Sequence, residues 1–406
     1  MNQTATVLLK KWISLWKLFA LVSRTVSPSK QAYGLSAIVS PNAALQICCQ
    51  ISLGQNGEMC TTARSVFSRI YLGESMTSSE EFSGHQFPSV TDLPSWRRAG
   101  LRYYPLSFYL KERFGQKVWK LSLDAGCSCP NVDGTVSTEG CIFCDLAATA
   151  PSRRLGLASR DIPAQIKEGI ARVGKGGKIS AFIAYFQPGT NTHGDLRSLA
   201  QLWEEAASHP QVVGIAVGTR PDAVPDPVLD VLADLSTRTW VQLELGVQSA
   251  HDRSLAWLRR HHDAAASWDA IRRAKARKLF VVAHIILGIP GETLADVEVT
   301  ARRLASLGVD GIKIHNLHVL RGTDLEELWR SGQFRPMDRQ DYIQAVVSFL
   351  ECLSPSCVIE RLVGDAPPEF LLAPEWCLEK TTVIREIHEE LERRGTFQGS
   401  RFEPER

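Results

Sequence analysis

Four cysteines lie within eighteen residues of one another, in the stretch CSCPNVDGTVSTEGCIFC from Cys127 to Cys144. Clustered thiols of this kind can form disulfides, bind zinc, exchange electrons or hold an iron–sulfur cluster. The chain has 10 cysteines in 406 residues, and they are clumped rather than evenly spread. That distribution favours a reducing compartment over a secreted disulfide framework, so we expect metal chemistry and a cytoplasmic location.

The spacing of the four thiols leaves two kinds of metal site open. Cys127, Cys129, Cys141 and Cys144 together can bind zinc, as in a non-enzymatic interaction protein, although a single residue between the first two is short for zinc ligands. Cys129, Cys141 and Cys144 alone, separated by eleven and two residues, can hold an iron–sulfur cubane. Three ligands leave one iron open for chemistry, whereas a plain electron carrier needs a fourth.

Apolar runs of strand length recur after residue 96 and alternate with helical patterns. They are rich in Val, Ile and Leu, which is typical of parallel strands buried on both faces. The runs are VWKLSLDAG (118–126), ISAFIAYFQ (179–187), VVGIAVGTRP (212–221), WVQLELGVQS (240–249), LFVVAHIILGIPG (279–291) and GIKIHNLHVL (311–320). The helical stretches between them are IPAQIKEGIARV, LRSLAQLWEEAAS, PVLDVLADLS, SWDAIRRAKARK and LADVEVTARRLASLG. These units predict an α/β fold, a partial (β/α)6 barrel whose chemistry lies at the carboxyl ends of the strands.

Two further helical stretches, RQDYIQAVVSFLECL and TTVIREIHEELERRG, follow the last of these strands. We therefore expect the barrel over residues 96–325 and a C-terminal helical extension over 326–406. Between the two helices lies RLVGDAPPEFLLAPEW (361–376), for which a structural connection and a substrate-facing loop are equally open.

Residues 1–95 lack sustained periodicity, and we expect a disordered segment and linker, or an over-extension upstream of a true start at Met76. Within it, LLKKWISLWKLFALV is too short to span a bilayer, so we expect no membrane span, with a membrane-surface helix as the alternative. Residues 1–75 carry seven basic and two acidic residues, whereas the remainder carries 39 basic and 42 acidic ones. The cysteine-bearing part thus has no overall positive charge for holding a polyanion.

Around the cysteines the chain resembles the radical S-adenosylmethionine (radical SAM) superfamily and, within it, the YhcC-type proteins, which are relatives of the catalytic subunit of elongator. The likeness runs from about Trp96 to Gly399. Its motifs include KLSLDAGCSCPNVDG, GCIFC, AYFQPGTNT, GTRPD, ELGVQSAHD, HIILGIPGET and GVDGIKIHNLHVL. The family pattern has no cysteine at position 127. The resemblance therefore implies that Cys129, Cys141 and Cys144 hold a [4Fe–4S] cluster and that Cys127 stands outside the ligand set.

The resemblance further implies an enzyme that cleaves S-adenosylmethionine reductively to a 5′-deoxyadenosyl radical, which abstracts hydrogen from a substrate. The residues implied for binding this cofactor are Tyr185, Gln187, Thr219, Arg220, Gln248, Ser249, Gly288 and Gly291. Gln187 and neighbouring backbone carbonyls stand where many relatives have Gly-Gly-Glu for the amino group. Arg220 is suited to the carboxylate, with a structural ion pair as the alternative. Gly288 and Gly291 let the backbone approach the adenine.

Four further side chains stand in or near the predicted strands. Lys313 and His315 share one face of the last strand and could reach the barrel lumen. His284 is interpreted as a core histidine. His262 lies in LRRHHDAAA and matches an Arg-x-His pattern that follows the QS motif in related enzymes, but a histidine on a helix surface is the favoured interpretation.

The implied partners are an unidentified substrate, either a small molecule or RNA, and an electron donor such as a flavodoxin or ferredoxin. The segment WRRAGLRYYPLSFYLKERFG could stack against RNA, but a helix that docks beneath the barrel is the favoured interpretation.

Overall fold

The computed structural model describes residues 93–145, 161–173, 179–364 and 366–404. The chain divides into two units, Met1–Gln86 and Phe87–Arg406, and every described residue belongs to the second. The expectations for residues 1–92, including a start at Met76, lie outside the described residues.

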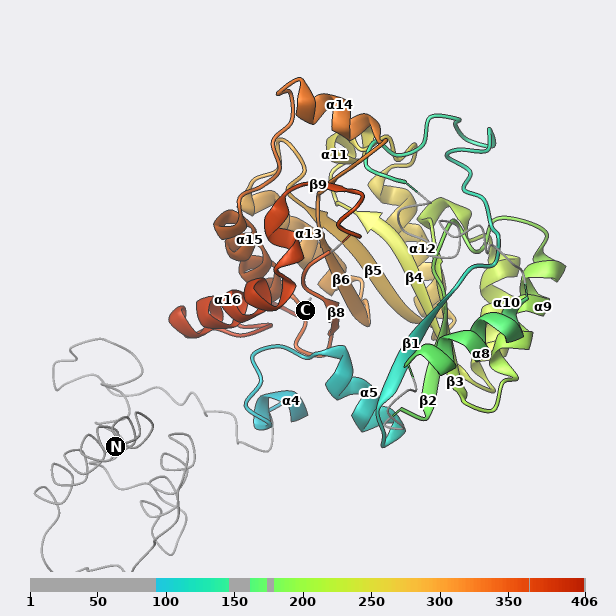
Figure 1. Ribbon diagram of the computed structural model, residues 1–406. Helices are drawn as coiled ribbons and strands as arrows, with labels where there is room; N and C mark the ends of the chain where they lie inside the picture. The colour runs from blue at the N-terminus through green and yellow to red at the C-terminus, as the bar shows by residue number, and fades with distance from the viewer. Residues whose placement is uncertain (1–92, 146–160, 174–178, 365, 405–406) are drawn as a thin grey trace, which may run out of the picture. The chain divides into compact units, whose positions relative to one another are not determined.

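Seven parallel strands form one curled sheet in the order β1-β2-β3-β4-β5-β6-β8 (Figure 1). Each of the six predicted runs contains one strand of this sheet, so the predicted partial barrel is confirmed. The seventh strand, β8, was not predicted, and it pairs with β6 beyond the expected six units. The strands are β1 (Val118–Leu123), β2 (Ala181–Phe186), β3 (Val212–Thr219), β4 (Trp240–Gln248), β5 (Phe280–Leu287), β6 (Gly311–Asn316) and β8 (Val358–Arg361).

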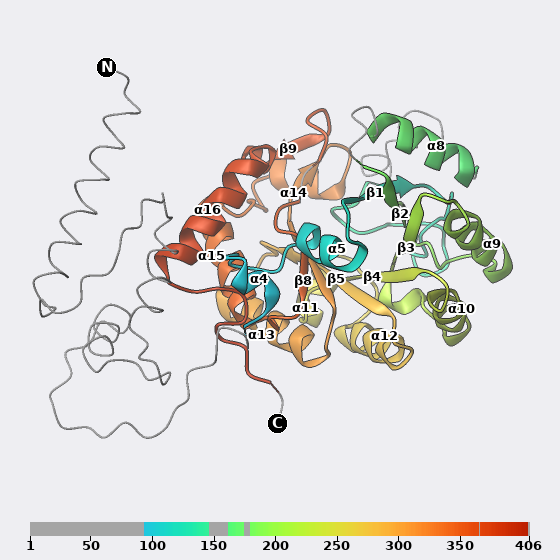
Figure 2. The ribbon, with the colours of Figure 1, turned by 90° about the horizontal axis from the view of Figure 1, so that it is seen from below.

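Helices cover the outer face of this sheet, as Figure 2 shows from below. The five helical stretches expected between strands and the two expected after them all form helices. They are α8 (Ile162–Val173), α9 (Leu196–Ala207), α10 (Asp226–Ser236), α12 (Ala264–Ala276), α13 (Leu294–Ser306), α15 (Arg339–Cys352) and α16 (Lys380–Arg393). The shorter helices are α4 (Ser95–Arg98), α5 (Leu106–Phe114), α11 (Asp252–Trp257) and α14 (Asp324–Arg330), with single turns η2 (Pro221–Ala223) and η3 (Glu375–Leu378). None of the described helices has the length and apolar character needed to cross a bilayer.

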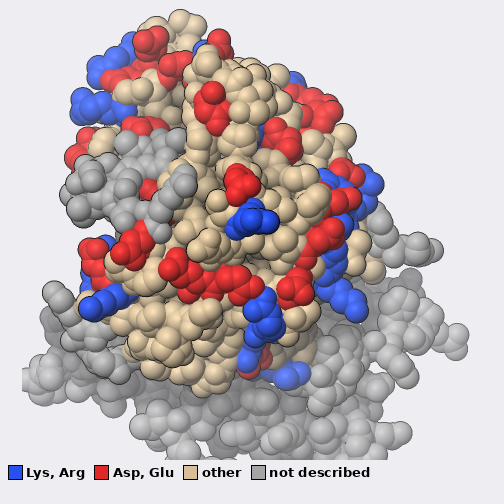
Figure 3. Space-filling model, turned by 90° about the vertical axis from the view of Figure 1, so that its right-hand side faces the viewer, with Lys and Arg blue, Asp and Glu red and all other residues tan. Residues whose placement is uncertain are grey.

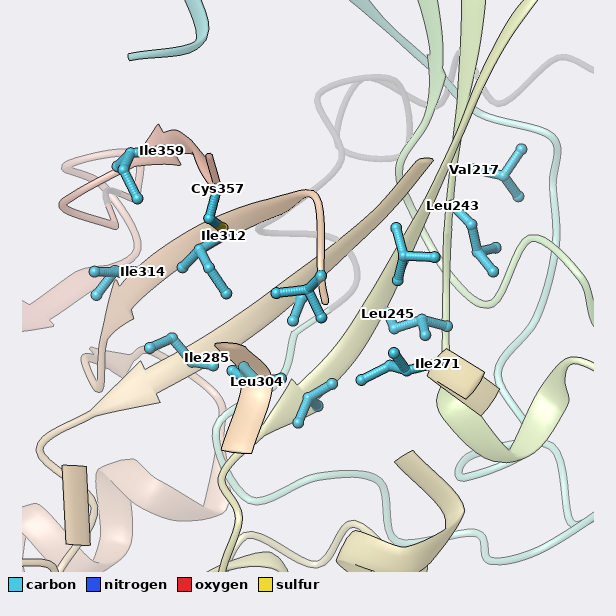
Figure 4. Close-up of a cluster of buried hydrophobic side chains, with 14 of the residues drawn as sticks. Val217, Leu243, Leu245, Ile271, Ile285, Leu304, Ile312, Ile314, Cys357 and Ile359 are labelled. Carbon is cyan, nitrogen blue, oxygen red and sulfur yellow. The ribbon is translucent and has the colours of Figure 1, made fainter. Parts of the chain in front are cut away.

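The main core lies between the sheet and these helices. Alternate positions of the strands, such as Leu243 and Leu245 on β4, point toward Ile271 of α12 and Leu304 of α13 (Figure 4). These side chains are fully buried. The opposite positions of each strand therefore face the concave side of the sheet, here called the lumen.

Helix α5 closes the lumen at the amino-terminal ends of the strands. It follows the bridge between Pro105 and Ile359, and its Tyr109 ring lies 5.3 Å from Phe280 and 6.4 Å from Trp240 between centroids. The aromatic segment that could have stacked on RNA is thus packed as a helix beneath the barrel. On the face that carries α9 and α10, acidic and basic side chains are interspersed (Figure 3).

A layer of charged side chains, centred on Glu244 of β4, crosses the lumen above this apolar floor. The Glu244 carboxylate accepts hydrogen bonds from Lys120 of β1 at 2.9 Å, from His284 of β5 at 2.7 Å, and from Lys313 of β6. Burial alone would raise the pKa of Glu244, but Lys120 and Lys313 hold that pKa well below its ordinary value. The carboxylate is therefore ionised and fully surrounded by donors.

The two edge strands of the sheet are joined by the same layer. Lys120 of β1 contacts Glu360 of β8 at 2.6 Å, although the two strands are not neighbours in the sheet. A side-chain ion pair, rather than a backbone ladder, thus links the two ends of the half-barrel.

A two-stranded ribbon follows the carboxyl end of β6. Its strands β7 (Val319–Leu320) and β9 (Leu371–Ala373) pair antiparallel, so the loop over residues 361–376 returns to the mouth of the lumen. Gly364 lies against the end of β6, where an added Cβ would come within 3.3 Å of His315 and Asn316. The loop therefore forms part of the wall of the mouth.

Replacing Glu244 by Gln is expected to destabilise the protein by about 3–5 kcal/mol, because two buried ammonium groups lose one carboxylate and must share that of Glu360. Urea unfolding followed by circular dichroism measures the change. Glu389→Gln is the control, because Glu389 and its partner Arg385 have side chains that are 57% and 59% exposed. An exposed ion pair of this kind stabilises the folded protein by about 0–1 kcal/mol. Equal stabilities for the two variants would contradict the structural role of the layer.

Candidate functional site

The cysteine loop begins directly after β1 and folds back on itself. The amides of Val132 and Asp133 donate to the carbonyl of Cys129, and Gly140 donates to the carbonyl of Asn131 at 2.7 Å. The Asn131 side-chain amide then reaches the Cys141 sulfur at 3.3 Å. The eleven residues between the first two proposed ligands therefore form a closed turn that returns Cys141 toward Cys129.

The segment from Cys141 to Cys144 is fastened by backbone hydrogen bonds to two other elements. Ile142 donates to the carbonyl of Leu258 at 3.3 Å and accepts from the amide of Leu325 at 3.0 Å. Its side chain is 5% exposed and belongs to a buried cluster with both of these residues. The Cys-x-x-Cys turn itself is closed by the Cys144 amide, which donates to the Cys141 carbonyl.

Cys127 lies apart from this arrangement. Its side chain belongs to the main hydrophobic core between sheet and helices. Its carbonyl meets the turn after β2, where a Cβ on Gly189 (φ +77°) would come within 2.4 Å of it. Only glycine can make this approach, and it locks the start of the cysteine loop against the AYFQPGTNT motif.

Arg260 brings a cation to Cys141 of the cysteine loop, and it was not among the predicted site residues. Its Nη1 donates to the Cys141 sulfur at 3.2 Å and its Nη2 to the carbonyl of Gly246 at 3.0 Å. Both neighbours, Arg259 and His261, have φ of 54°, a conformation uncommon outside glycine. This unusual turn aims Arg260 inward. Arg260 is the arginine of the Arg-x-His pattern, from which only His262 was considered.

Arg220, expected at the cofactor carboxylate, forms the ion pair that was its alternative. It donates to both carboxylate oxygens of Asp222, at 2.9 and 2.8 Å, and to the carbonyl of Arg260 at 2.7 Å. Burial would raise the pKa of Asp222, but the bonds from Arg220 lower it below its ordinary value. The Arg220–Asp222 pair thus supports the backbone of the turn that carries Arg260.

The other predicted cofactor residues lie at or just beyond the carboxyl ends of β2 to β5. Thr219 shares a 2.5 Å hydrogen bond with Thr192, and Ser249 donates to Glu292 at 2.5 Å. Gln248 has a φ of 67° at an irregularity in the β4–β5 ladder. The structure therefore brings these residues to the edge of the sheet that carries the cysteine loop.

The remaining predicted positions lie on the same edge. The Gln187 amide continues the β1–β2 ladder by donating to Leu123, and Tyr185 points into the lumen, where Lys313 lies 4.2 Å from its ring centroid. Gly288 and Gly291 have φ of 89° and 81°, as a tight turn after β5 requires.

His262 differs from its sequence interpretation. It lies in the turn between α11 and α12 rather than on a helix surface, and its Nδ1 is 3.1 Å from the carbonyl of Asp263. Burial, followed by the charge of Arg260, lowers the pKa of His262 to about 4. The helix-surface interpretation was wrong because the chain makes a turn with positive φ at Arg259 and His261 before α12 begins at Ala264.

Three cysteine sulfurs are the ligand type that an iron–sulfur cluster requires. Their side chains are not arranged around a common metal position. Within the described ranges no three His, Cys, Asp or Glu side chains surround a common point at ligand distances. Three free cysteines of one loop nevertheless stand beside two buried arginines. The Arg220 Nη1 and Arg260 Nε atoms and the Asn131 Oδ1 are buried with no hydrogen-bond partner among the described residues. The two guanidinium nitrogens are donors and suit an anionic group, whereas the Asn131 oxygen is an acceptor and suits a donor.

Family models match most of the described chain. The model of the radical SAM superfamily matches residues 134–304, and that of the Radical_SAM C-terminal domain matches residues 309–393. The chain is 38% identical to the uncharacterized protein YtqA of Bacillus subtilis over 302 residues, which cover 74% of this chain and 93% of that protein. It is 37% identical to protein YhcC of Escherichia coli over 292 residues, 72% of this chain and 92% of that protein.

More distant relatives share the fold. The mouse elongator complex protein 3 is 31% identical over 163 residues, 39% of this chain and 29% of that protein. Among solved structures, the Elp3 of the archaeon Methanocaldococcus infernus aligns with a TM-score of 0.52 at 16% identity, over 70% of this chain and 64% of that one. With its parallel half-barrel and its cysteine loop at the mouth, the chain belongs to the radical SAM superfamily, whose enzymes use a [4Fe–4S] cluster and S-adenosylmethionine.

Proposed function

We propose that Cys129, Cys141 and Cys144 hold the [4Fe–4S] cluster and that the protein uses it to cleave S-adenosylmethionine during modification of its substrate. When bound and reduced, this cluster supplies the electron that yields methionine and a 5′-deoxyadenosyl radical. The observation that carries the proposal is the hydrogen bond from Arg260 to the Cys141 sulfur, because a buried cation there stabilises thiolate ligands.

The packing of Cys127 is the reason for leaving it out of the proposed ligand set. Its side chain is 6% exposed and lies among the apolar residues between sheet and helices. Zinc bound by all four cysteines, the competing hypothesis, would require that side chain to leave the core. The cost of exposing this packed region disfavours a four-thiolate site.

Arg260 and Gln248 are the side chains best placed for the cofactor carboxylate. A Cβ added at Gly246 would lie 3.2 Å from Arg260 Nη2 and 2.9 Å from Gln248 Nε2, so both groups converge over one backbone position. Arg260 also reaches the sulfur of Cys141, whereas Arg220 is already engaged by Asp222. In this proposal Arg260 binds the cofactor carboxylate. Arg220 positions Arg260 through its hydrogen bond to the Arg260 carbonyl.

The other predicted residues have supporting parts in the same proposal. Gln187 and the carbonyls after Tyr185 serve the amino group, Thr219 and Ser249 serve the ribose hydroxyls, and the turn at Gly288 and Gly291 serves the adenine. Exclusion of water is a task of the loops over the mouth. An electron donor such as a flavodoxin or ferredoxin supplies the reducing electron.

The substrate of the proposed reaction is a small molecule or RNA. One relative, 26% identical over 203 residues, is named a tRNA uridine(34) acetyltransferase from Methanocaldococcus infernus, and these residues cover 36% of that protein. This likeness keeps RNA among the candidates.

Single replacement of Cys129, Cys141 or Cys144 by Ala is expected to abolish the cluster, whereas Cys127→Ala should retain it. Anaerobically reconstituted wild-type protein should be brown and contain about four irons per chain, without zinc. Iron and sulfide analysis with absorption spectroscopy makes the comparison. Zinc in place of iron, or loss of the cluster in the Cys127 variant, would favour the four-thiolate site.

Incubation of reconstituted protein with dithionite and S-adenosylmethionine is expected to yield 5′-deoxyadenosine, quantified by liquid chromatography. Arg260→Met should keep the iron but weaken binding of S-adenosylmethionine at least about tenfold, because it loses a charge-assisted hydrogen bond. Arg272→Met, at an exposed position of α12, is the matched control. Product no greater than in a cluster-free sample would refute the proposed reaction, and unaltered affinity in Arg260→Met would refute the role of Arg260.

A further inference from the structure

Asn131 lies in the cysteine loop, two residues after Cys129, and its side chain is completely buried. Its amide nitrogen has two acceptors. Nδ2 donates to the carbonyl of Arg259 at 2.8 Å and to the sulfur of Cys141 at 3.3 Å. Both N–H groups of the amide are therefore used, and one of them is directed at a proposed cluster ligand.

The two acceptors determine the orientation of the Asn131 amide. A carbonyl oxygen and a cysteine sulfur both accept hydrogen bonds, so the opposite orientation would place Oδ1 against two acceptors. As the amide lies, Oδ1 is buried with no hydrogen-bond partner among the described residues. A buried acceptor without a partner lowers stability, so the contacts of the nitrogen explain this side chain better than overall stability does.

The Cys141 sulfur receives a second hydrogen bond, from Arg260. The Arg260 Nη1 lies 3.2 Å from this sulfur. Asn131 also supports the second donor, because the Arg259 carbonyl that it binds belongs to the peptide bond leading into Arg260. The two donors to Cys141 are thus held together by one closed set of hydrogen bonds.

The three proposed ligands differ in these contacts. Among the described residues, hydrogen bonds reach the sulfur of Cys141 but not those of Cys129 and Cys144. Cys141 is also the buried one of the three, whereas Cys129 is half-buried and Cys144 exposed. A hydrogen bond is electrostatically stronger in a buried, weakly polar surrounding. The two donors therefore act on the ligand where their effect on a bound cluster is largest.

N–H groups that donate to a ligand sulfur favour the reduced form of an iron–sulfur cluster. Reduction adds one electron, and part of its negative charge resides on the ligand sulfurs, where the donors stabilise it. Removing such a donor therefore makes the midpoint reduction potential more negative. The Asn131 amide has this effect without adding a charge of its own.

We propose that Asn131 raises the reduction potential of the cluster through its hydrogen bond to Cys141. The step that it favours is the one-electron reduction of the [4Fe–4S] cluster from the 2+ to the 1+ state, with a flavodoxin or ferredoxin as reductant. The inference rests on the proposed function, because it requires a cluster bound by Cys129, Cys141 and Cys144. Asn131 is a positioning residue here, since it acts through Cys141 and the turn of Arg260.

Asn191 provides a matched comparison within the same chain. Its side chain is also completely buried, and its Oδ1 likewise has no partner among the described residues. Its Nδ2 donates to two carbonyls, that of Phe186 at 3.0 Å and that of Gly218 at 2.9 Å. The two asparagines thus make equivalent contacts, except that one acceptor of Asn131 is a cysteine sulfur.

Redox titration of the reconstituted full chain, followed by electron paramagnetic resonance, tests the proposal with dithionite as reductant. At the wild-type midpoint potential, Asn131→Leu should lower the ratio of reduced to oxidised cluster by about threefold to tenfold, because a hydrogen bond to the reduced form is lost. Leucine keeps the branched shape of the side chain. Asn191→Leu loses an equally buried amide and should keep the wild-type midpoint potential.

Wild-type protein labelled with ¹⁵N in its asparagine side chains gives a measurement that does not depend on the variants folding. Pulsed electron paramagnetic resonance of its reduced cluster should show a weak hyperfine coupling to ¹⁵N, transmitted through the N–H···S hydrogen bond. Among the asparagines that the structure describes, Asn131 is the one that donates to a sulfur, so the coupling reports on this contact.

Three results would overturn the inference: an unaltered midpoint potential in Asn131→Leu, an equal shift in Asn191→Leu, or absence of the ¹⁵N coupling. Each of them is measured on a cluster that is present, so the proposed function survives it. Failure of the proposed function would instead show as absence of the cluster from the wild-type protein, or of 5′-deoxyadenosine.

Discussion

The buried carboxylate of Glu244 constrains the curvature of the sheet. It is ionised inside the lumen, so it requires cationic partners, and these come from β1 and β6, with an imidazole from β5. A flat sheet would hold those strands too far apart to meet at one point. Because Lys120 also reaches Glu360 on the opposite edge, the same interactions draw the two ends of an open half-barrel together.

The curvature in turn determines what the mouth can hold. The cysteine loop leaves β1 but is fastened by the turn after β2, by Leu258 at the end of α11, and by Leu325 in α14. These attachments are far apart in sequence and meet only because the strands curl. The left-handed turn that carries Arg260 belongs to the same assembly, since the pair of Arg220 and Asp222 supports its backbone. The site is thus built largely from backbone contacts to a fixed frame.

The sequence predicted those features whose residue pattern is typical of one kind of structure. Unalternating runs of Val, Ile and Leu predicted six strands, and the spacing of Cys129, Cys141 and Cys144 with the surrounding motifs predicted the superfamily. Strand β8 was missed because VIER is short and ends in two charged residues. The Glu360 carboxylate is accommodated because Lys120 of β1 pairs with it across the lumen. Arg260 was missed because its position depends on positive φ values at Arg259 and His261. Residue propensities do not predict positive φ at arginine or histidine. The domain boundaries and the roles of the cofactor residues stay predictions.

Electron paramagnetic resonance of the reduced, reconstituted protein tests the central claim, a cluster with three cysteine ligands and one open iron, most directly. Addition of S-adenosylmethionine should change the spectrum of the reduced cluster, because the cofactor then binds the open iron. A cluster spectrum that is identical with and without S-adenosylmethionine would show that no iron is open to it, and would contradict the account.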